Sequence, residues 1–187
     1  MNELINLLKS DPNIANAYGA IGSAVAAFLA LIISVISICV SIKTLSIQRK
    51  HNELSVRPFA EVLVANFENS LRIKLANNGS GPLIINGISI SNGHIEQNSL
   101  IDWMPELPHD KLWTTFTGNL QNRIILAGRD LTLLELTKVA GELNFEESRD
   151  IVRAALSPLT IKVNYSDIYE NKLHPHQKDL SWFGRTL

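Results

Sequence analysis

The most prominent pattern in the chain is a long apolar run near the N-terminus. No Asp, Glu, Lys or Arg occurs in residues 12–42, and residues 20–42 are almost wholly apolar or small. A helix needs roughly 20 apolar residues to cross a bilayer core of about 30 Å. The pattern therefore predicts one transmembrane helix over residues 14–42.

The charges on either side of this run favour a transmembrane helix over a cleaved signal peptide and predict its orientation. A cleaved signal peptide is the alternative, but it carries a basic segment before its apolar core, whereas Glu3 and Asp11 flank Lys9 here. The cations follow the run instead: Lys43, Arg49 and Lys50. Because positive residues favour the cytoplasmic side of a membrane, we expect the N-terminus outside and the C-terminal domain in the cytoplasm. The lone Cys39 lies within the run, which is typical of a chain without disulfides in a reducing compartment.

Two short segments border the helix. Residues 1–13 include Leu4, Ile5, Leu7 and Leu8, and they predict either a short amphipathic helix on the outer leaflet or a frayed terminus. Residues 43–57 hold helix-forming residues without Gly or Pro, so we expect the membrane helix to continue as a cytosolic stalk. Pro58 ends it, because the residue before a proline favours extended conformations.

The remaining segment, residues 58–187, changes from a helical to a two-residue period. Three strands are predicted over residues 59–67, 71–77 and 82–93, the first apolar on both faces and so central in its sheet. Gly87 indicates a bulge in the third strand. The Gly-rich segment 77–82 predicts a hairpin turn, and it lacks the Lys-Ser/Thr ending of a phosphate-binding loop.

The second half of this domain adds further elements of both kinds. Strands are expected at 121–128, 130–137, 159–167 and, as a last edge strand, 179–183, with a loop over 172–178. A helix is expected at 145–156 with Asn144 as its cap, and residues 96–119 form an irregular insertion. The fold class is therefore α+β, with one N-terminal transmembrane helix and stalk followed by a mostly antiparallel β-sandwich with one or two helices.

Several motifs in the domain resemble a known group of proteins. Arg57-Pro58 after the membrane helix, then Asn77, Gly79, Gly81 and Pro82 before an apolar strand, and Tyr165 to Lys172 near the end, are similar to small bacterial single-pass membrane proteins with a cytosolic β-sandwich. Some of those look like the membrane effectors that accompany retrons in anti-phage defence. The resemblance covers the first half of the domain and its end, and it implies an inner-membrane effector that a partner holds in check.

The transmembrane segment carries small residues at spacings of three and four. They are Gly19, Ser23, Ala26, Ala30, Ser34, Ser37 and Ser41. This spacing places them on one face of a helix, and small faces let membrane helices approach closely. We interpret the stripe as a surface for self-association or for a partner's helices, and a polar path along the Ser34 to Ser41 end is a further reading. The alternative is that small residues are simply common in membrane helices.

Charge and chemistry narrow the function classes. Residues 43–187 contain 16 cations and 16 acidic residues, so nothing favours direct nucleic-acid binding, although Lys43, Arg49 and Lys50 could contact anionic lipid. No nucleophile motif is present, His174 and His176 read as loop residues without a third metal ligand, and Asp167 with Glu170 reads as a turn. We therefore expect no enzyme activity, no metal and no cofactor.

Two tryptophans in the insertion, Trp103 and Trp113, predict either a protein contact or core packing beneath the loop. With the stripe and the resemblance, they lead to one expectation and one alternative. The expectation is an anti-phage membrane effector that a protein partner restrains and that perturbs the membrane through helix association. The alternative is a tethered, non-enzymatic scaffold or sensor that recruits a cytosolic protein.

Overall fold

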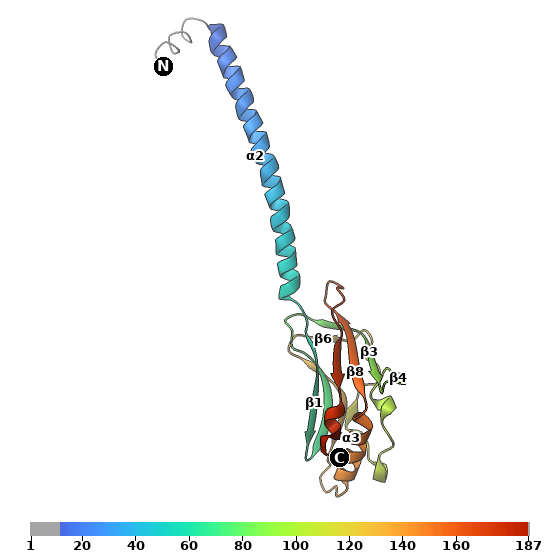
Figure 1. Ribbon diagram of the computed structural model, residues 1–187. Helices are drawn as coiled ribbons and strands as arrows, with labels where there is room; N and C mark the ends of the chain where they lie inside the picture. The colour runs from blue at the N-terminus through green and yellow to red at the C-terminus, as the bar shows by residue number, and fades with distance from the viewer. Residues whose placement is uncertain (1–11, 187) are drawn as a thin grey trace. The chain divides into compact units, whose positions relative to one another are not determined.

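The computed structural model describes residues 12–186 (Figure 1). The chain divides into two compact units, Met1–Asn52 and Glu53–Leu187. The amphipathic segment expected in residues 1–13 lies outside the described residues except for its last two positions. Those two positions belong to the long helix that follows.

The first described element is one uninterrupted helix, α2 (Pro12–Ser55). Its 44 residues rise about 66 Å at 1.5 Å per residue, more than twice the thickness of a bilayer core. None of its residues is buried, and within residues 12–186 it is the one helix long and apolar enough to cross a membrane. The structure thus confirms that the apolar helix continues through the expected stalk without a break.

The second unit consists of two sheets in which every strand pairing is antiparallel. The first sheet has the order β1-β2-β7-β5 and comprises β1 (Ala60–Phe67), β2 (Ser70–Asn77), β7 (Asp130–Thr137) and β5 (Thr115–Phe116). The second has the order β4-β3-β8-β9 and comprises β4 (Glu96–Gln97), β3 (Leu83–Ser91), β8 (Thr160–Ser166) and β9 (His176–Asp179). A short strand, β6 (Ile124–Ile125), also pairs with β3.

One hydrophobic core joins the two sheets and the helix α3 (Phe145–Leu156). In β2 the buried Leu71, Ile73 and Leu75 alternate with Arg72 and Lys74, as the two-residue period predicts. Each fully buried aliphatic side chain of this kind contributes about 1.5–3 kcal/mol. Helix α3 has the predicted bounds and packs against a 3₁₀ segment, η3 (Ser181–Thr186).

The predicted hairpin at residues 77–82 is wrong, because β2 and β3 belong to different sheets. The segment instead carries the chain from one sheet to the other beside the residues that follow α2. A Cβ on Gly79 would overlap the backbone of Arg57 and Phe59, and a Cβ on Gly81 would overlap the carbonyl of Val56. The two glycines are needed for this close backbone approach and not for a hairpin turn.

The predicted central position of the first strand is also wrong. Strand β1 pairs with β2 alone and forms an edge of its sheet. Its inner face buries Ala60 and Val62, whereas Phe59 and Leu63 are exposed. Exposed apolar residues on an edge strand produce the same sequence pattern as a central strand that is buried on both faces.

The end of the chain differs from the expectation in two ways. The last strand is His176–Asp179, most of which was expected as a loop, and residues 181–183 of the expected strand lie in η3. The change occurs where the Asp179 carboxylate accepts the backbone N–H of Ser181 at 2.7 Å, which turns the chain.

At α3, the Asn144 side chain makes no capping hydrogen bond, contrary to the prediction. The bulge beside Gly87 is confirmed by the register shift between Ile85 and Gly87.

Candidate functional site

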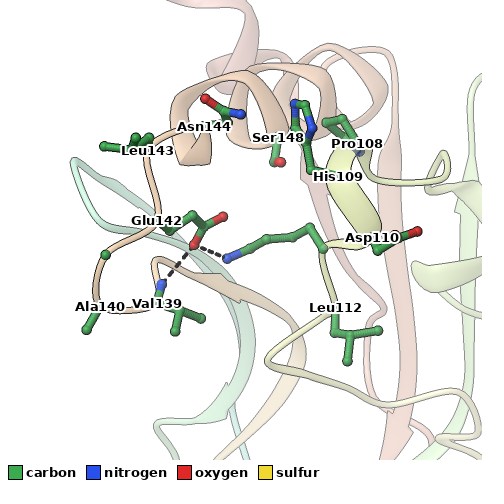
Figure 2. Close-up of a pocket in the computed structure, with 12 residues that line it drawn as sticks. Pro108, His109, Asp110, Leu112, Val139, Ala140, Glu142, Leu143, Asn144 and Ser148 are labelled. Atoms are coloured by element: carbon green, nitrogen blue, oxygen red, sulfur yellow. Dashed lines mark hydrogen bonds and ion pairs between the residues drawn. The ribbon is translucent and has the colours of Figure 1, made fainter.

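An open cavity of about 480 Å³ lies at one end of the sandwich (Figure 2). Three segments line it: the 3₁₀ turn η2 (Pro108–Asp110) with the two residues after it, the loop 139–144, and the first turn of α3. The loop follows the last residue of β7, so this is the end at which β1 turns into β2, and we call it the pocket end. The insertion 96–119 therefore contributes one wall of a cavity.

The interior of the cavity is organised by an ion pair between Lys111 and Glu142. The Lys111 Nζ lies 2.5 Å from the Glu142 Oε2, and the two side chains are only 7% and 19% exposed. The ammonium also donates to the carbonyl of Thr137 at 2.9 Å and lies 5.1 Å from the centre of the Phe145 ring. The pair connects the η2 segment to the loop, and Figure 2 shows Glu142 on the loop with its interactions as dashed lines.

The environment of Glu142 keeps its carboxylate ionised. Burial alone raises the pKa of Glu142, but the hydrogen bonds from Lys111 and from the N–H of Val139 outweigh it. The net pKa lies below the ordinary value for a glutamate. The pair is thus a fixed structural element of the cavity rather than a proton donor near neutral pH.

The backbone beside this pair is strained. His109 and Asp110 have φ values of 57° and 53°, in the left-handed region that non-glycine residues rarely adopt. The ring of His109 lies 3.3 Å from the Glu147 carboxylate, which connects η2 to the first turn of α3. Two consecutive residues in this conformation store about 1–3 kcal/mol each, and such strain is concentrated at binding sites.

The rim of the cavity is apolar and unusually exposed. Leu112, Val139 and Leu143 are 82%, 66% and 92% exposed, and Figure 2 shows Leu112 and Leu143 directed away from the ion pair. Six acidic residues and three cations occur in residues 106–111 and 138–150. An apolar rim in acidic surroundings suits a partner that presents apolar side chains beside basic ones.

The tryptophans of the insertion do not lie on this rim. Trp103 and Trp113 are half-buried and pack against the main core, as the core-packing alternative predicts. The Trp103 indole nitrogen is buried and has no hydrogen-bond acceptor within the described part of the chain. Their role in a partner contact remains a prediction.

The seven small residues of the predicted stripe all occur within α2, and all are exposed. At 100° per residue they fall within about 80° of arc on the helix surface. The hydroxyls of Ser23, Ser37 and Ser41 each donate to the carbonyl four residues earlier, at 2.8 Å. These bonds satisfy the hydroxyl protons of the three serines within the helix itself.

The three predicted membrane-proximal cations lie on the same helix after the apolar run. Lys43, Arg49 and Lys50 are all exposed. They belong to the first compact unit, whereas the cavity belongs to the second.

The histidines expected in a loop differ from one another. His174 is an exposed loop residue, whereas His176 lies in β9, and its Nε2 accepts the backbone N–H of Val62 at 3.2 Å. Burial lowers the pKa of His176 below its ordinary value, and Lys178 lowers it further, while Glu61 raises it. Within residues 12–186, no three His, Cys, Asp or Glu residues are grouped so that they could hold a metal ion.

The Asp167 segment is a turn, as its sequence predicts. The buried Asp167 carboxylate accepts the N–H groups of Tyr169 and Asn171, each at 2.9 Å, and the amide of the Asn171 side chain at 3.1 Å. The Asp167 carboxylate therefore stabilises its own turn. Asp167 is not among the residues that line the cavity.

Sequence reasoning missed the ion pair and the apolar rim. Lys111 and Glu142 are 31 positions apart, and no local pattern connects them. Of the rim residues, Leu143 alone has polar neighbours on both sides, Glu142 and Asn144, in a segment without regular periodicity, and this was the usable signal.

The chain was compared with known proteins by sequence and by structure. No family model matches it, and no curated protein or solved structure is significantly similar. The argument for function therefore rests on the residues themselves.

Proposed function

We propose that the protein is a single-pass inner-membrane effector of bacterial anti-phage defence, with its N-terminus outside and its β-sandwich in the cytoplasm. A protein partner binds the sandwich and restrains the effector. Release allows α2 helices of several copies to associate and perturb the membrane. The protein works without enzymatic activity in this proposal.

The observation that carries the proposal is the stripe on α2. A helix with no buried residue and an apolar surface requires a nonpolar environment. Between Gly19 and Ser41 one face of it offers only small side chains, which allow two backbones to approach closely. The hydroxyl protons of Ser23, Ser37 and Ser41 are bonded within the helix, so association gains van der Waals contact without leaving these donors unsatisfied in lipid.

The restraining contact is assigned to the pocket end of the sandwich. The exposed Leu112, Val139 and Leu143 would bury their side chains against an apolar partner surface. The Lys111–Glu142 pair holds the two walls of the cavity in place and so keeps the surface preformed.

Membrane depolarisation on induced expression tests this proposal. We expect the chain expressed without its genetic neighbours to depolarise the inner membrane, followed with a potential-sensitive dye. The triple variant Ala26→Leu, Ala30→Leu, Ser34→Leu should abolish the effect while it still inserts in the membrane. If the wild-type chain leaves the potential unchanged, both alone and after phage infection of its native host, the effector proposal is wrong.

A tethered scaffold or sensor is the second candidate, and the preformed cavity favours it. In that case α2 serves only as an anchor, and the pocket end recruits a cytosolic protein. Replacement of residues 14–42 by an unrelated transmembrane helix separates the two. Function that survives the exchange supports the scaffold, and function that is lost supports the effector.

A further inference from the structure

We propose that the sandwich carries a second binding surface, specific for anionic phospholipid, at the end opposite the pocket. The surface combines exposed apolar side chains with unpaired cations on two loops. It goes beyond the proposed effector function, because it concerns the sandwich and not helix association.

The chain itself defines this end. Residues 56–59 enter the sandwich there, since the N–H of Asn78 donates to the carbonyl of Phe59 at 2.8 Å and the N–H of Ser80 donates to that of Arg57 at 3.2 Å. The first loop, residues 121–129, reaches the same end through Asn77, whose N–H donates to the Arg129 carbonyl at 2.9 Å and whose side-chain oxygen accepts the N–H of Phe59 at 3.2 Å. We call this end the entry end.

A second loop reaches the entry end from the other sheet. Ile84, at the start of β3, pairs both with Ile124 of β6 and with Ser166 at the end of β8. The two strands flank β3 at this residue, so the β8–β9 loop, residues 167–175, begins two strand spacings, about 10 Å, from β6 at the same end of the sheet. Two loops distant in sequence and one chain-entry segment thus form a single surface.

Each loop of the entry end presents large apolar side chains to solvent. Ile124 and Leu126 are 61% and 60% exposed on the first loop, and Ile168 and Tyr169 are both 47% exposed on the second. Aliphatic and tyrosine side chains of this kind partition into the boundary between headgroups and acyl chains.

The two loops and the entry segment carry cations that have no acidic partner. Arg57, Arg123, Arg129 and Lys172 are exposed, and none forms an ion pair with another residue in the range 12–186. The acidic residues of these loops are only Asp167, which is buried in its turn, and Glu170. A domain without net charge is therefore basic at the entry end and acidic at the pocket end.

This charge separation identifies anionic lipid as the occupant. A basic surface with interspersed apolar side chains suits a negatively charged bilayer, whereas an acidic protein partner would leave the exposed isoleucines without a role. The covalent link to α2 adds to this, because the 13 residues from Lys43 to Ser55 rise only about 20 Å. A tether of that length keeps the surface at a high effective concentration next to the bilayer, so weak individual contacts suffice.

The test uses the full chain in lipid nanodiscs with one fluorescent label. In a Cys39→Ser background, Ala127→Cys places the label in the first entry-end loop, and Ala140→Cys places it in the pocket-end loop. Both alanines are exposed loop residues, so the two positions are matched. The discs contain either phosphatidylcholine alone or a mixture with phosphatidylglycerol, and each carries a lipid with a spin label on its headgroup as the quencher.

We expect the label at position 127 to be quenched in phosphatidylglycerol discs and the label at position 140 to stay bright. The double variant Arg123→Gln, Arg129→Gln should lower the ratio of docked to undocked domains roughly 25-fold, about fivefold for each arginine. Raising the salt to 1 M should act in the same direction. Equal quenching at positions 127 and 140, or quenching at 127 that is the same without phosphatidylglycerol, would overturn the proposal. Absence of quenching at position 127 in both kinds of disc would also overturn it and would leave the surface to a protein partner.

Discussion

The Nε2 of His176 accepts the backbone N–H of Val62, at a distance of 3.2 Å. This bond connects β9, an edge of one sheet, to β1, an edge of the other. It satisfies a donor of the free side of β1, which β2 does not reach, and so closes one side of the sandwich by a side chain.

The His176 bond makes the stability of the sandwich sensitive to pH. Only the neutral ring can make this bond, because a protonated Nε2 has no lone pair with which to accept the Val62 N–H. Burial lowers the pKa of His176 in the folded protein and so favours the neutral ring. The stabilisation is complete above the ordinary pKa of 6.5 and is lost as the pH falls through the lowered pKa of the folded state. Loss of the bond costs about 0.5–1.5 kcal/mol.

Thermal unfolding of the purified chain between pH 5 and pH 8 checks this prediction. The variant His176→Gln, whose amide oxygen accepts without titrating, should unfold with a smaller dependence on pH. His174→Gln is the matched control, since His174 is exposed, and it should keep the wild-type dependence. Identical pH profiles for wild type and His176→Gln would contradict the account.

Gly81 should tolerate no side chain. A Cβ there would overlap the Val56 carbonyl, and that backbone is held by the bond from Ser80 to Arg57. We expect Gly81→Ala to lower the free energy of unfolding by about 1–3 kcal/mol. Gly118→Ala is the control, because nothing lies within 4 Å of its added Cβ. A change of melting temperature as small as that of the control would show that the close approach is not required.

These glycines also show where sequence reasoning succeeded and where it failed. The alternation in β2 and the apolar stripe of α3 depend on residues that are neighbours in the chain, so both elements were predicted with accurate bounds. The motif Asn77-x-Gly-x-Gly indicates a turn in the sequence, but it does not indicate that the strands on either side, β2 and β3, belong to different sheets. Whether two adjacent strands form a hairpin or cross between sheets depends on what packs against the turn, here Val56 to Phe59.

The cavity illustrates the same limit at longer range. Nothing near Lys111 in the sequence indicates that Glu142 completes its environment, because the contact exists only once β5, β7 and α3 are assembled. The stripe on α2 could be read directly, since a helix fixes the angular position of each residue.

The Lys111–Glu142 pair should behave as a coupled unit. Removal of one charge leaves the other partly buried without its ion partner, which costs about 1–3 kcal/mol, whereas removal of both is less harmful. We expect Lys111→Met and Glu142→Gln each to destabilise the sandwich strongly. The double variant should lose less than the sum of the two.

A double-mutant cycle by urea denaturation measures this coupling. Lys74 and Asp130 serve as the reference pair, since they lie 3.1 Å apart but are 25% and 46% exposed. Their coupling should stay below about 1 kcal/mol. Additive effects at Lys111 and Glu142 would show that the pair does not hold the cavity together.

The central claim is that one face of α2 is the working surface of the protein. Two alanine pairs with the same spacing allow a matched comparison, Ala26 with Ala30 on the stripe and Ala20 with Ala24 about 120° around the helix. Both double replacements by leucine keep the helix apolar and long enough to span the bilayer. Only leucines at positions 26 and 30 place bulky side chains on the stripe of small residues.

Depolarisation of the inner membrane on induced expression, compared between these two double variants at equal membrane abundance, tests the claim most directly. The account predicts that Ala20→Leu, Ala24→Leu depolarises like the wild type and that Ala26→Leu, Ala30→Leu reduces the effect at least tenfold, the loss expected when about 1.4 kcal/mol of association free energy is removed. Equal depolarisation by the two variants would contradict it.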